Sequence, residues 1–201
     1  MSDCLACDIN SHATYLVKTR RDQEALDVAE PLLKGKQSCT VVPAVTYAVL
    51  LPAAIRLPDR ELAKSLHNKG YRKVKNNPSY LDSCADHLVY VVCVGNWKRA
   101  IELLERHTPW LISACDLIDK FHFHLATMLL LESLVAHGHK RYKVRLPKEL
   151  NCYRQSDDYD LAELAQWYRN EVDSIANRFN QRNGNDYFCH IVAEYRQLVT
   201  R

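Results

Sequence analysis

The feature that most restricts the fold of this chain is a short helical motif that occurs three times in its first half. Each copy centres on an alanine, Ala25, Ala63 or Ala100, set among charged and aliphatic residues, and the alanines lie 38 and 37 residues apart. A period of this length is typical of stacked helix pairs, in which each pair buries its apolar face against the next. Such stacks usually bind another protein, so the repeat predicts a class of function without identifying the partner.

The composition agrees with a helical protein of moderate size. The chain has 201 residues, 47% of them hydrophobic and 25% charged, with only five glycines. That length allows one sizeable core or a short solenoid of helix pairs, and the low glycine content argues against a β-sandwich rich in turns. The net charge is +3, and basic and acidic residues are interspersed along the chain. Because no basic patch stands out, we expect no nucleic-acid partner.

Capping residues, prolines and glycines divide the chain into expected helices. We expect one all-α domain made of helical repeats over 1–138, an irregular connection over 139–160, and C-terminal helices over 161–201 packed on the same domain. Gly35 and Gly138 are expected at helix ends, and Pro52 is expected to kink its helix. The helix before 94 is expected to be capped by Ser79 or Asp82, and the long helix before 138 by Asp116 or Asp119. The expected helices span 10–19, 22–33, 44–56, 58–74, 79–94, 97–107, 108–115, 116–137, 161–180 and 187–198.

The segment 87–107 is the clearest copy of the repeat, and it resembles a tetratricopeptide repeat. Gly95 lies at the turn between its two helices, Trp97 follows two residues later and Ala100 five residues later, while Leu88 and Val91 occupy the apolar positions of the first helix. Glycine allows the tight reversal, and the small alanine lets the two helices approach. The resemblance covers 11–107 and implies an all-α, right-handed stack of antiparallel helix pairs, closed by a capping C-terminal helix.

The copies around Ala25 and Ala63 depart from this family pattern. They have Arg20 and Leu57 or Pro58 where the turn glycine is expected. Another α–α repeat or a helical bundle is therefore the alternative fold. The segments 4–8, 38–43 and 178–188 are similar to bacterial tetratricopeptide proteins that begin Cys-x-x-Cys, which implies a bacterial scaffold and says nothing of catalysis.

The cysteines offer one candidate metal site. Cys4 and Cys7 have the spacing of half a zinc site, and Cys39 or the pair Cys84 and His87 would supply the other ligands. This set predicts a structural zinc ion that holds the N-terminus to the stack. The alternative, which the sequence favours, is a frayed N-terminus with free thiols at Cys4 and Cys7 and buried side chains at Cys39 and Cys84.

A partner-binding surface is expected on the first helix of each pair, which lines the concave face of such a stack. Aromatic and imidazole side chains there would grip an extended peptide or a helix by stacking and hydrogen bonding. The candidates share that chemistry, although histidine and tyrosine are often core residues. They are His12, Tyr15, Tyr47, His87, Tyr90, His122 and His124.

The motifs of common enzymes are missing from the sequence, as are a signal peptide and an apolar stretch long enough to span a bilayer. We therefore expect a non-catalytic, cytoplasmic scaffold or adaptor that binds a protein or peptide and does not bind a membrane. Two alternatives stay open. One is a regulatory protein that senses a ligand or peptide, and the other is a toxin-neutralising or assembly subunit.

Overall fold

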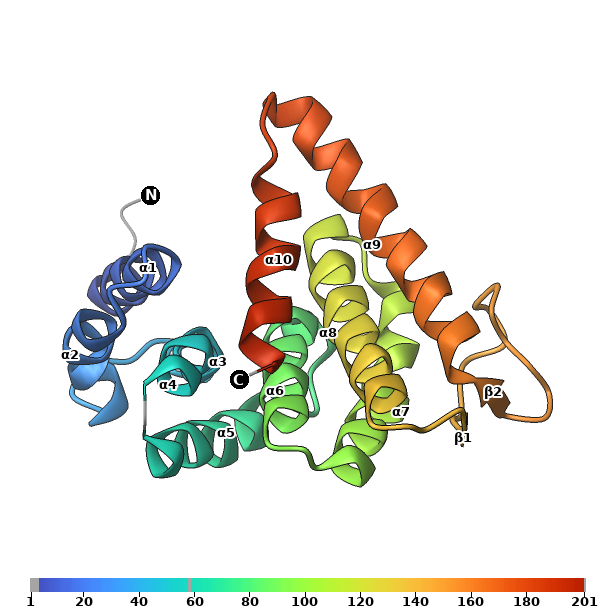
Figure 1. Cartoon of the computed structure of the whole chain (residues 1–201). Coiled ribbons are helices and arrows are strands. Elements are labelled where there is room, and N and C mark those ends of the chain that lie inside the picture. The colour runs from blue at the N-terminus through green and yellow to red at the C-terminus, as the bar shows by residue number, and fades with distance from the viewer. Residues whose placement is uncertain (1–3, 58, 201) are drawn as a thin grey trace. The chain divides into compact units, whose positions relative to one another are not determined.

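The computed structural model of the chain describes residues 4–57 and 59–200 and is mostly helical, which confirms the all-α class (Figure 1). Its contacts divide the chain into two compact units, Met1–Tyr90 and Val91–Arg201. The boundary falls inside helix α6 (Leu81–Cys93). The boundary between the two units therefore lies inside the segment 1–138 in which we expect the repeats.

The N-terminal unit consists of short helices joined by tight turns. The expected kink at Pro52 is confirmed as a break at Leu50, because proline has no N–H to donate to the carbonyl four residues earlier. The first helix begins at Leu5, earlier than the expected start near residue 10. Before α6 the elements are α1 (Leu5–Lys18), α2 (Asp22–Leu33), α3 (Ala44–Val49), α4 (Leu51–Arg56), α5 (Arg60–Val74) and a 3-10 turn η1 (Pro78–Tyr80).

The turn between α1 and α2 has the same hydrogen bonds as the turn after α6, although only the latter contains glycine. Arg20 has φ +62° and Gly95 has φ +69°. In both turns this residue donates its N–H to the carbonyl three positions earlier, and the next N–H bonds the carbonyl five positions earlier, at 2.9–3.2 Å. This is the Schellman motif, in which a left-handed residue ends a helix. Arg20 therefore departs from the family pattern in residue type, but the turn itself is the same.

Polar contacts fasten the first two helices to the next two. The Thr46 hydroxyl donates to the Asn10 side chain at 2.7 Å, which joins α3 to α1. The Arg56 guanidinium forms a largely buried ion pair with Asp22 and also donates to the Val17 carbonyl at 3.0 Å. Each contact joins residues of two different helices. Together these contacts therefore set how the α1–α2 pair lies on α3 and α4.

The helices of the N-terminal unit pack most closely at Gly70 on α5. A Cβ at this position would overlap the Cβ of Tyr47 on α3 and would lie 2.9 Å from the His87 ring on α6. The His67 ring stacks on the Tyr90 ring, with the two ring centroids 4.7 Å apart, and meets the His87 ring edge-on, with centroids 5.1 Å apart. The absence of a side chain at Gly70 thus lets three helices meet in one buried aromatic cluster.

The C-terminal unit is built around a long helix that is apolar on nearly all sides. Helix α8 (Leu117–Ala136) packs against α7 (Trp97–Ser113), α9 (Leu161–Asn183) and α10 (Tyr187–Val199). Glu132 on α8 accepts hydrogen bonds from Arg169 on α9 and Arg196 on α10. Burial opposes the charge on Glu132, but the two guanidinium groups outweigh it and lower the pKa of this carboxyl group. This carboxylate ties three helices together.

Two expectations for the C-terminal unit are wrong. The helices expected over 97–107 and 108–115 form the single helix α7, which continues through Pro109 because the buried residues Thr108 and Leu111 extend its apolar stripe. The segment 139–160, expected to be irregular, contains an antiparallel pair of strands, β1 (Arg141–Lys143) and β2 (Asp158–Asp160). Strands of three residues are too short to leave an alternating pattern in the sequence.

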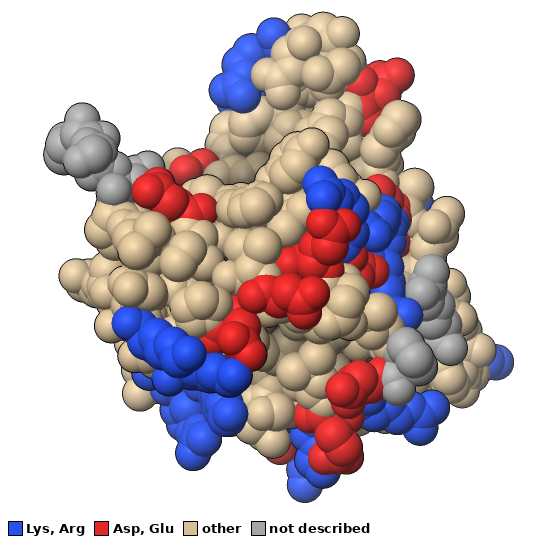
Figure 2. Space-filling model, turned by 90° about the vertical axis from the view of Figure 1, so that its left-hand side faces the viewer, with Lys and Arg blue, Asp and Glu red and all other residues tan. Residues whose placement is uncertain are grey.

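Charged side chains of both signs are interspersed on the molecular face shown in Figure 2. Exposed ion pairs at helical spacing in the N-terminal unit include Lys34 with Glu30 at 2.5 Å and Lys64 with Glu61 at 3.8 Å. Exposed pairs of this kind contribute little to stability. None of the described helices combines the length and hydropathy that a membrane span requires.

We predict that Gly70→Ala destabilises the N-terminal unit. Alanine favours a helix by about 1 kcal/mol over glycine, but overpacking against Tyr47 and His87 costs about 3 kcal/mol. The net loss of about 2 kcal/mol would be measured by urea unfolding followed by circular dichroism. Gly35→Ala separates backbone strain from overpacking, because its φ of +70° is strained for alanine by about 1 kcal/mol, while nothing lies within 4 Å of the added Cβ; it should therefore be destabilised less than Gly70→Ala. A Gly70→Ala protein as stable as the wild type would contradict the packing described here.

Candidate metal centre

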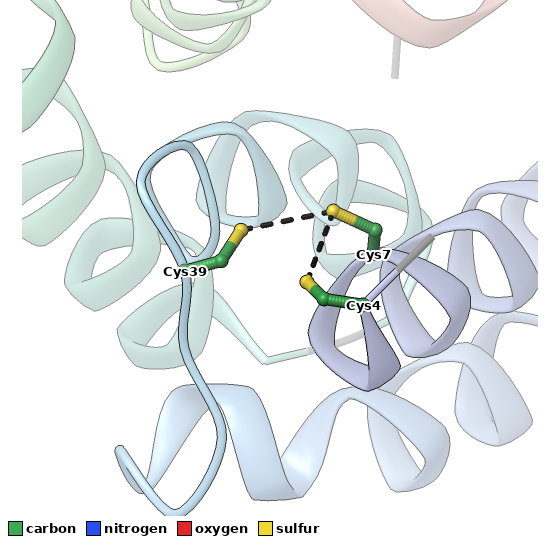
Figure 3. Close-up of side chains that lie close together, drawn as sticks. All are labelled: Cys4, Cys7 and Cys39. Carbon is green, nitrogen blue, oxygen red and sulfur yellow. Dashed lines mark hydrogen bonds between the residues drawn. The ribbon is translucent and has the colours of Figure 1, made fainter. Parts of the chain in front are cut away.

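Three cysteine thiols from two segments of the N-terminal unit lie close together (Figure 3). Cys4 occupies the N-cap position of α1, and Cys7 lies in the first turn of that helix. Cys39 comes from the loop between α2 and α3, and all three side chains point toward one another in Figure 3. Within the described part of the chain, this is the one group of three or more potential metal ligands.

The distances between the sulfur atoms fit a shared metal ion. The Sγ atoms of Cys4 and Cys7 are 3.4 Å apart, those of Cys7 and Cys39 are 3.7 Å apart, and all three lie within 4.8 Å of one another. Two thiolates on a tetrahedral zinc ion, each about 2.3 Å from the metal, are about 3.8 Å apart. The cluster is therefore already close to the geometry of a zinc–thiolate site.

The loop that carries Cys39 is shaped to support a thiolate. The backbone N–H groups of Val42 and Val41 lower the pKa of the Cys39 thiol, because a hydrogen bond from an N–H group stabilises the thiolate. The Cys39 N–H in turn donates to the Val42 carbonyl at 2.9 Å, which closes the loop on itself. Residues Val41 and Val42 thus contribute to the site through their backbone, so no pattern of side chains in the sequence points to them.

The central thiol holds its proton more tightly. Hydrogen bonds with Cys4 and then Cys39 raise the pKa of Cys7 to about 12, because neighbouring sulfurs compete for one negative charge. A divalent cation removes this competition, since it replaces the proton and neutralises the thiolates together. Metal binding at this cluster would therefore be coupled to the loss of the thiol protons.

The thiol cluster rests on a small apolar cluster of its own. Ala6, Leu32 and Val42 are buried there, and Cys7 and Cys39 pack against them. One side of the sulfur group is therefore closed by protein, whereas the Cys4 side chain is exposed. A metal at this position would join the start of α1 to the loop before α3.

The structure confirms three members of the predicted ligand set as neighbours and excludes two. Cys84 and His87 lie on α6 with exposed fractions of 0%, and neither belongs to the thiol cluster. The His87 ring packs against Tyr71 at 5.7 Å and closes over Gly70. The two residues are one helical turn apart on α6, and packing directs both of them into the core.

The predicted binding residues divide sharply by burial. His12 and Tyr15 are exposed on one face of α1, where Tyr15 keeps 58% of its surface accessible. His122 is half-buried beside Phe121. The other candidates are buried and cannot contact a partner in this conformation; they are Tyr47, His87, Tyr90 and His124. Amphipathic rings fill a core as readily as they line a groove, so their spacing could not separate the two roles.

His124 is an uncharged core residue. Burial, and then the charge of Lys120, lower its pKa to about 4. Its ring packs against Tyr168 at 5.5 Å, and its Nδ1 atom has no hydrogen-bond partner among the described residues. A second buried histidine in the same unit, His107, has its pKa lowered to about 3 by burial and the charges of Arg106 and Arg99.

Comparisons with family models, curated proteins and solved structures give no match to this chain. The thiol cluster and the exposed face of α1 are therefore interpreted from their own chemistry.

We predict that Zn²⁺ stabilises the protein through the thiol cluster. Adding Zn²⁺ to chelator-treated, reduced protein should raise its melting temperature, because a ligand present at about 1,000 times its Kd stabilises by about 4 kcal/mol. Cys39→Ser should abolish this rise. The exposed Cys115, which lies outside the cluster, offers the control Cys115→Ser, which should respond like the wild type. An equal response of all three proteins would contradict the site.

We predict that the buried histidines make the C-terminal unit sensitive to mild acid. The unfolded chain binds a proton at His124 near pH 6.5, but the folded chain does so only near pH 4. Stability is therefore full above pH 6.5 and falls between pH 6.5 and 4, by up to about 1.4 kcal/mol per pH unit. Urea unfolding at a series of pH values should show a shallower pH slope for His124→Gln than for the wild type. A His124→Gln slope equal to the wild-type slope would refute this assignment.

Proposed function

We propose that the chain is a non-catalytic helical scaffold that binds another protein or a peptide, and that a structural zinc ion fastens its first helix. The observation that carries this proposal is the cluster of Cys4, Cys7 and Cys39, which joins α1 to the loop before α3. Three thiols that meet at the start of a helix give the chain the means to hold that helix in place.

Zinc suits this cluster better than a hard cation. Thiolates are soft ligands that select zinc, copper(I) or iron–sulfur centres over magnesium and calcium. The group holds sulfur atoms alone, within the residues that the structure describes. The role is structural because α1 buries only Ala6 in its first two turns, so apolar packing holds the start of this helix weakly.

The exposed face of α1 is the surface that we propose for the partner. His12 and Tyr15 lie one turn apart on this face, and Leu5 is exposed on the same helix. Arg21 and Glu24 at the start of α2 form an exposed ion pair, and their mutual hydrogen bond raises the pKa of Arg21 and lowers the pKa of Glu24, with smaller contributions from Tyr15 and His12, respectively. Aromatic side chains with a polar atom beside paired charges are typical of protein interfaces.

We further propose a tetratricopeptide-like stack in a bacterial cytoplasm. The α1–α2 pair, the packing of α5 on α3 and α4, and the shared turn at Arg20 and Gly95 support a repeated helix-pair plan. The anchoring residues Ala25, Ala63 and Ala100 are all buried, as close packing of helix pairs requires. Free thiols at all eight cysteines support a reducing compartment.

The partner surface is tested by affinity capture from the host with matched variants. We expect one stoichiometric partner with the wild type and its loss with Tyr15→Ala, because this substitution removes an exposed ring without disturbing the core. Tyr187→Ala removes a comparably exposed tyrosine from the C-terminal unit and should retain the partner. Capture that is equal for both variants, or no partner for the folded wild type, would count against this surface.

A further inference from the structure

The nearest pair of sulfur atoms in the thiol cluster belongs to Cys4 and Cys7. Their Sγ atoms are 3.4 Å apart, whereas those of Cys7 and Cys39 are 3.7 Å apart (Figure 3). A disulfide requires two sulfurs about 2.0 Å apart, so Cys4 and Cys7 are the pair already closest to bonding distance. Because they are three residues apart at the start of α1, their proximity does not depend on how this helix lies against the loop that carries Cys39.

The two thiols of this pair differ in their access to solvent. Cys4 is exposed, whereas Cys7 is half-buried and packs against the apolar cluster of Ala6, Leu32 and Val42. A small oxidant in solvent therefore reaches the Cys4 sulfur more easily than the Cys7 sulfur beside it. A solvent-accessible cysteine next to a second cysteine that can resolve its oxidised form is the common arrangement of reversible oxidation sites.

We propose that Cys4 and Cys7 form a reversible oxidation site, at which a peroxide converts their two thiols into one disulfide. Cys4 takes up the oxidant, and Cys7 resolves the product. In a reducing compartment such disulfides are transient and act in redox sensing rather than in stabilising the fold. A small thiol or dithiol returns the pair to its reduced form by thiol–disulfide exchange.

The reaction proceeds in two balanced steps. The Cys4 thiolate attacks one oxygen of hydrogen peroxide, the O–O bond breaks, hydroxide leaves, and Cys4 becomes a sulfenic acid. The Cys7 thiolate then attacks the Cys4 sulfur, the S–S bond forms, and the S–O bond breaks as a second hydroxide leaves. Because the sulfenic acid is neutral, Cys7 no longer competes with a Cys4 thiolate for one negative charge when it loses its proton. The two thiol protons and the two hydroxides give two water molecules, so two thiols are oxidised and one peroxide is reduced.

The disulfide removes metal ligands from the cluster. The thiolate is the form of cysteine that binds a metal, and an oxidised Cys4–Cys7 pair leaves only Cys39 of the three thiols. Zinc and the disulfide therefore exclude each other, so oxidation would release the ion that fastens α1 to the loop before α3. This consequence rests on the zinc function proposed above, whereas the disulfide itself needs only the two thiols.

The test treats the full, reduced and metal-free chain with hydrogen peroxide and maps its cysteines by mass spectrometry after trypsin digestion. Trypsin cleaves after Lys18 and Lys36, so a Cys4–Cys7 disulfide removes two hydrogens from one N-terminal peptide, whereas a Cys7–Cys39 disulfide joins two peptides. We expect the first product, formed at least tenfold faster than Cys115 is oxidised, and a small dithiol should reverse it. Cys115 is the internal control because it is exposed and lies outside the cluster.

Two variants test the roles of the cysteines. Cys39→Ser should form the Cys4–Cys7 disulfide as fast as the wild type, because both sulfurs of the pair lie at the start of α1. Cys4→Ser should slow the oxidation of Cys7 at least tenfold, because the exposed sulfur that takes up the oxidant is gone.

Several results would overturn the proposal. They are a disulfide that joins Cys7 to Cys39, oxidation of Cys4 no faster than that of Cys115, and a Cys4 product that a dithiol does not reverse. Titration with Zn²⁺ separates this failure from that of the zinc function. A reduced chain that binds zinc but forms no Cys4–Cys7 disulfide refutes the oxidation site alone, whereas a chain that forms the disulfide but binds no zinc refutes the zinc function alone. If both occur, peroxide added to the zinc-loaded chain should release zinc to a metal-sensitive dye in step with disulfide formation.

Discussion

The packing of the N-terminal unit depends on the missing side chain at Gly70. Helices α3, α5 and α6 meet there, and the Tyr47 and His87 side chains occupy the space that a Cβ would need. Because protein interiors are close-packed, this contact fixes the spacing of the helices around it. The position also explains why His87, a candidate ligand by its sequence, is a core residue. Its ring fills the space above the glycine instead of reaching a metal.

The thiol cluster adds a second constraint nearer the surface, where Cys4 is exposed and Cys7 and Cys39 are half-buried. Its three sulfurs come from a helix start and from a loop about thirty residues later, so they meet only when α1 and α2 fold back on each other. Few apolar residues hold this region, and a metal ion would supply what the core does not. In the proposed function, a metal at this site would fasten the helix whose exposed face we propose for the partner.

Local signals in the sequence predicted the helices well where a cap or a turn residue decides them. The start of α8 at Asp116 and its end before Gly138 are examples, since an Asp116 side-chain bond and a left-handed glycine end that helix. Prediction was wrong where packing overrides the local signal. A new helix was expected over 108–115, yet α7 continues through Pro109, because the buried residues before and after this proline lie on one stripe of the same helix. The strands β1 and β2 depend on pairing across a long loop, which a local pattern cannot show.

The sequence by itself determined the all-α class, the turn at Gly95, the buried alanines and the chemical type of the candidate metal ligands, because these depend on residue type and short spacing. Only the tertiary structure decided which of those residues meet. It brought Cys39 to Cys4 and Cys7, and it directed Cys84 and His87 into the core. It also left His12 and Tyr15 exposed and His122 half-buried, while it buried Tyr47, His87, Tyr90 and His124. The physical reason is that long-range contacts follow from how whole helices pack, and the same residue types serve a core or a surface equally well.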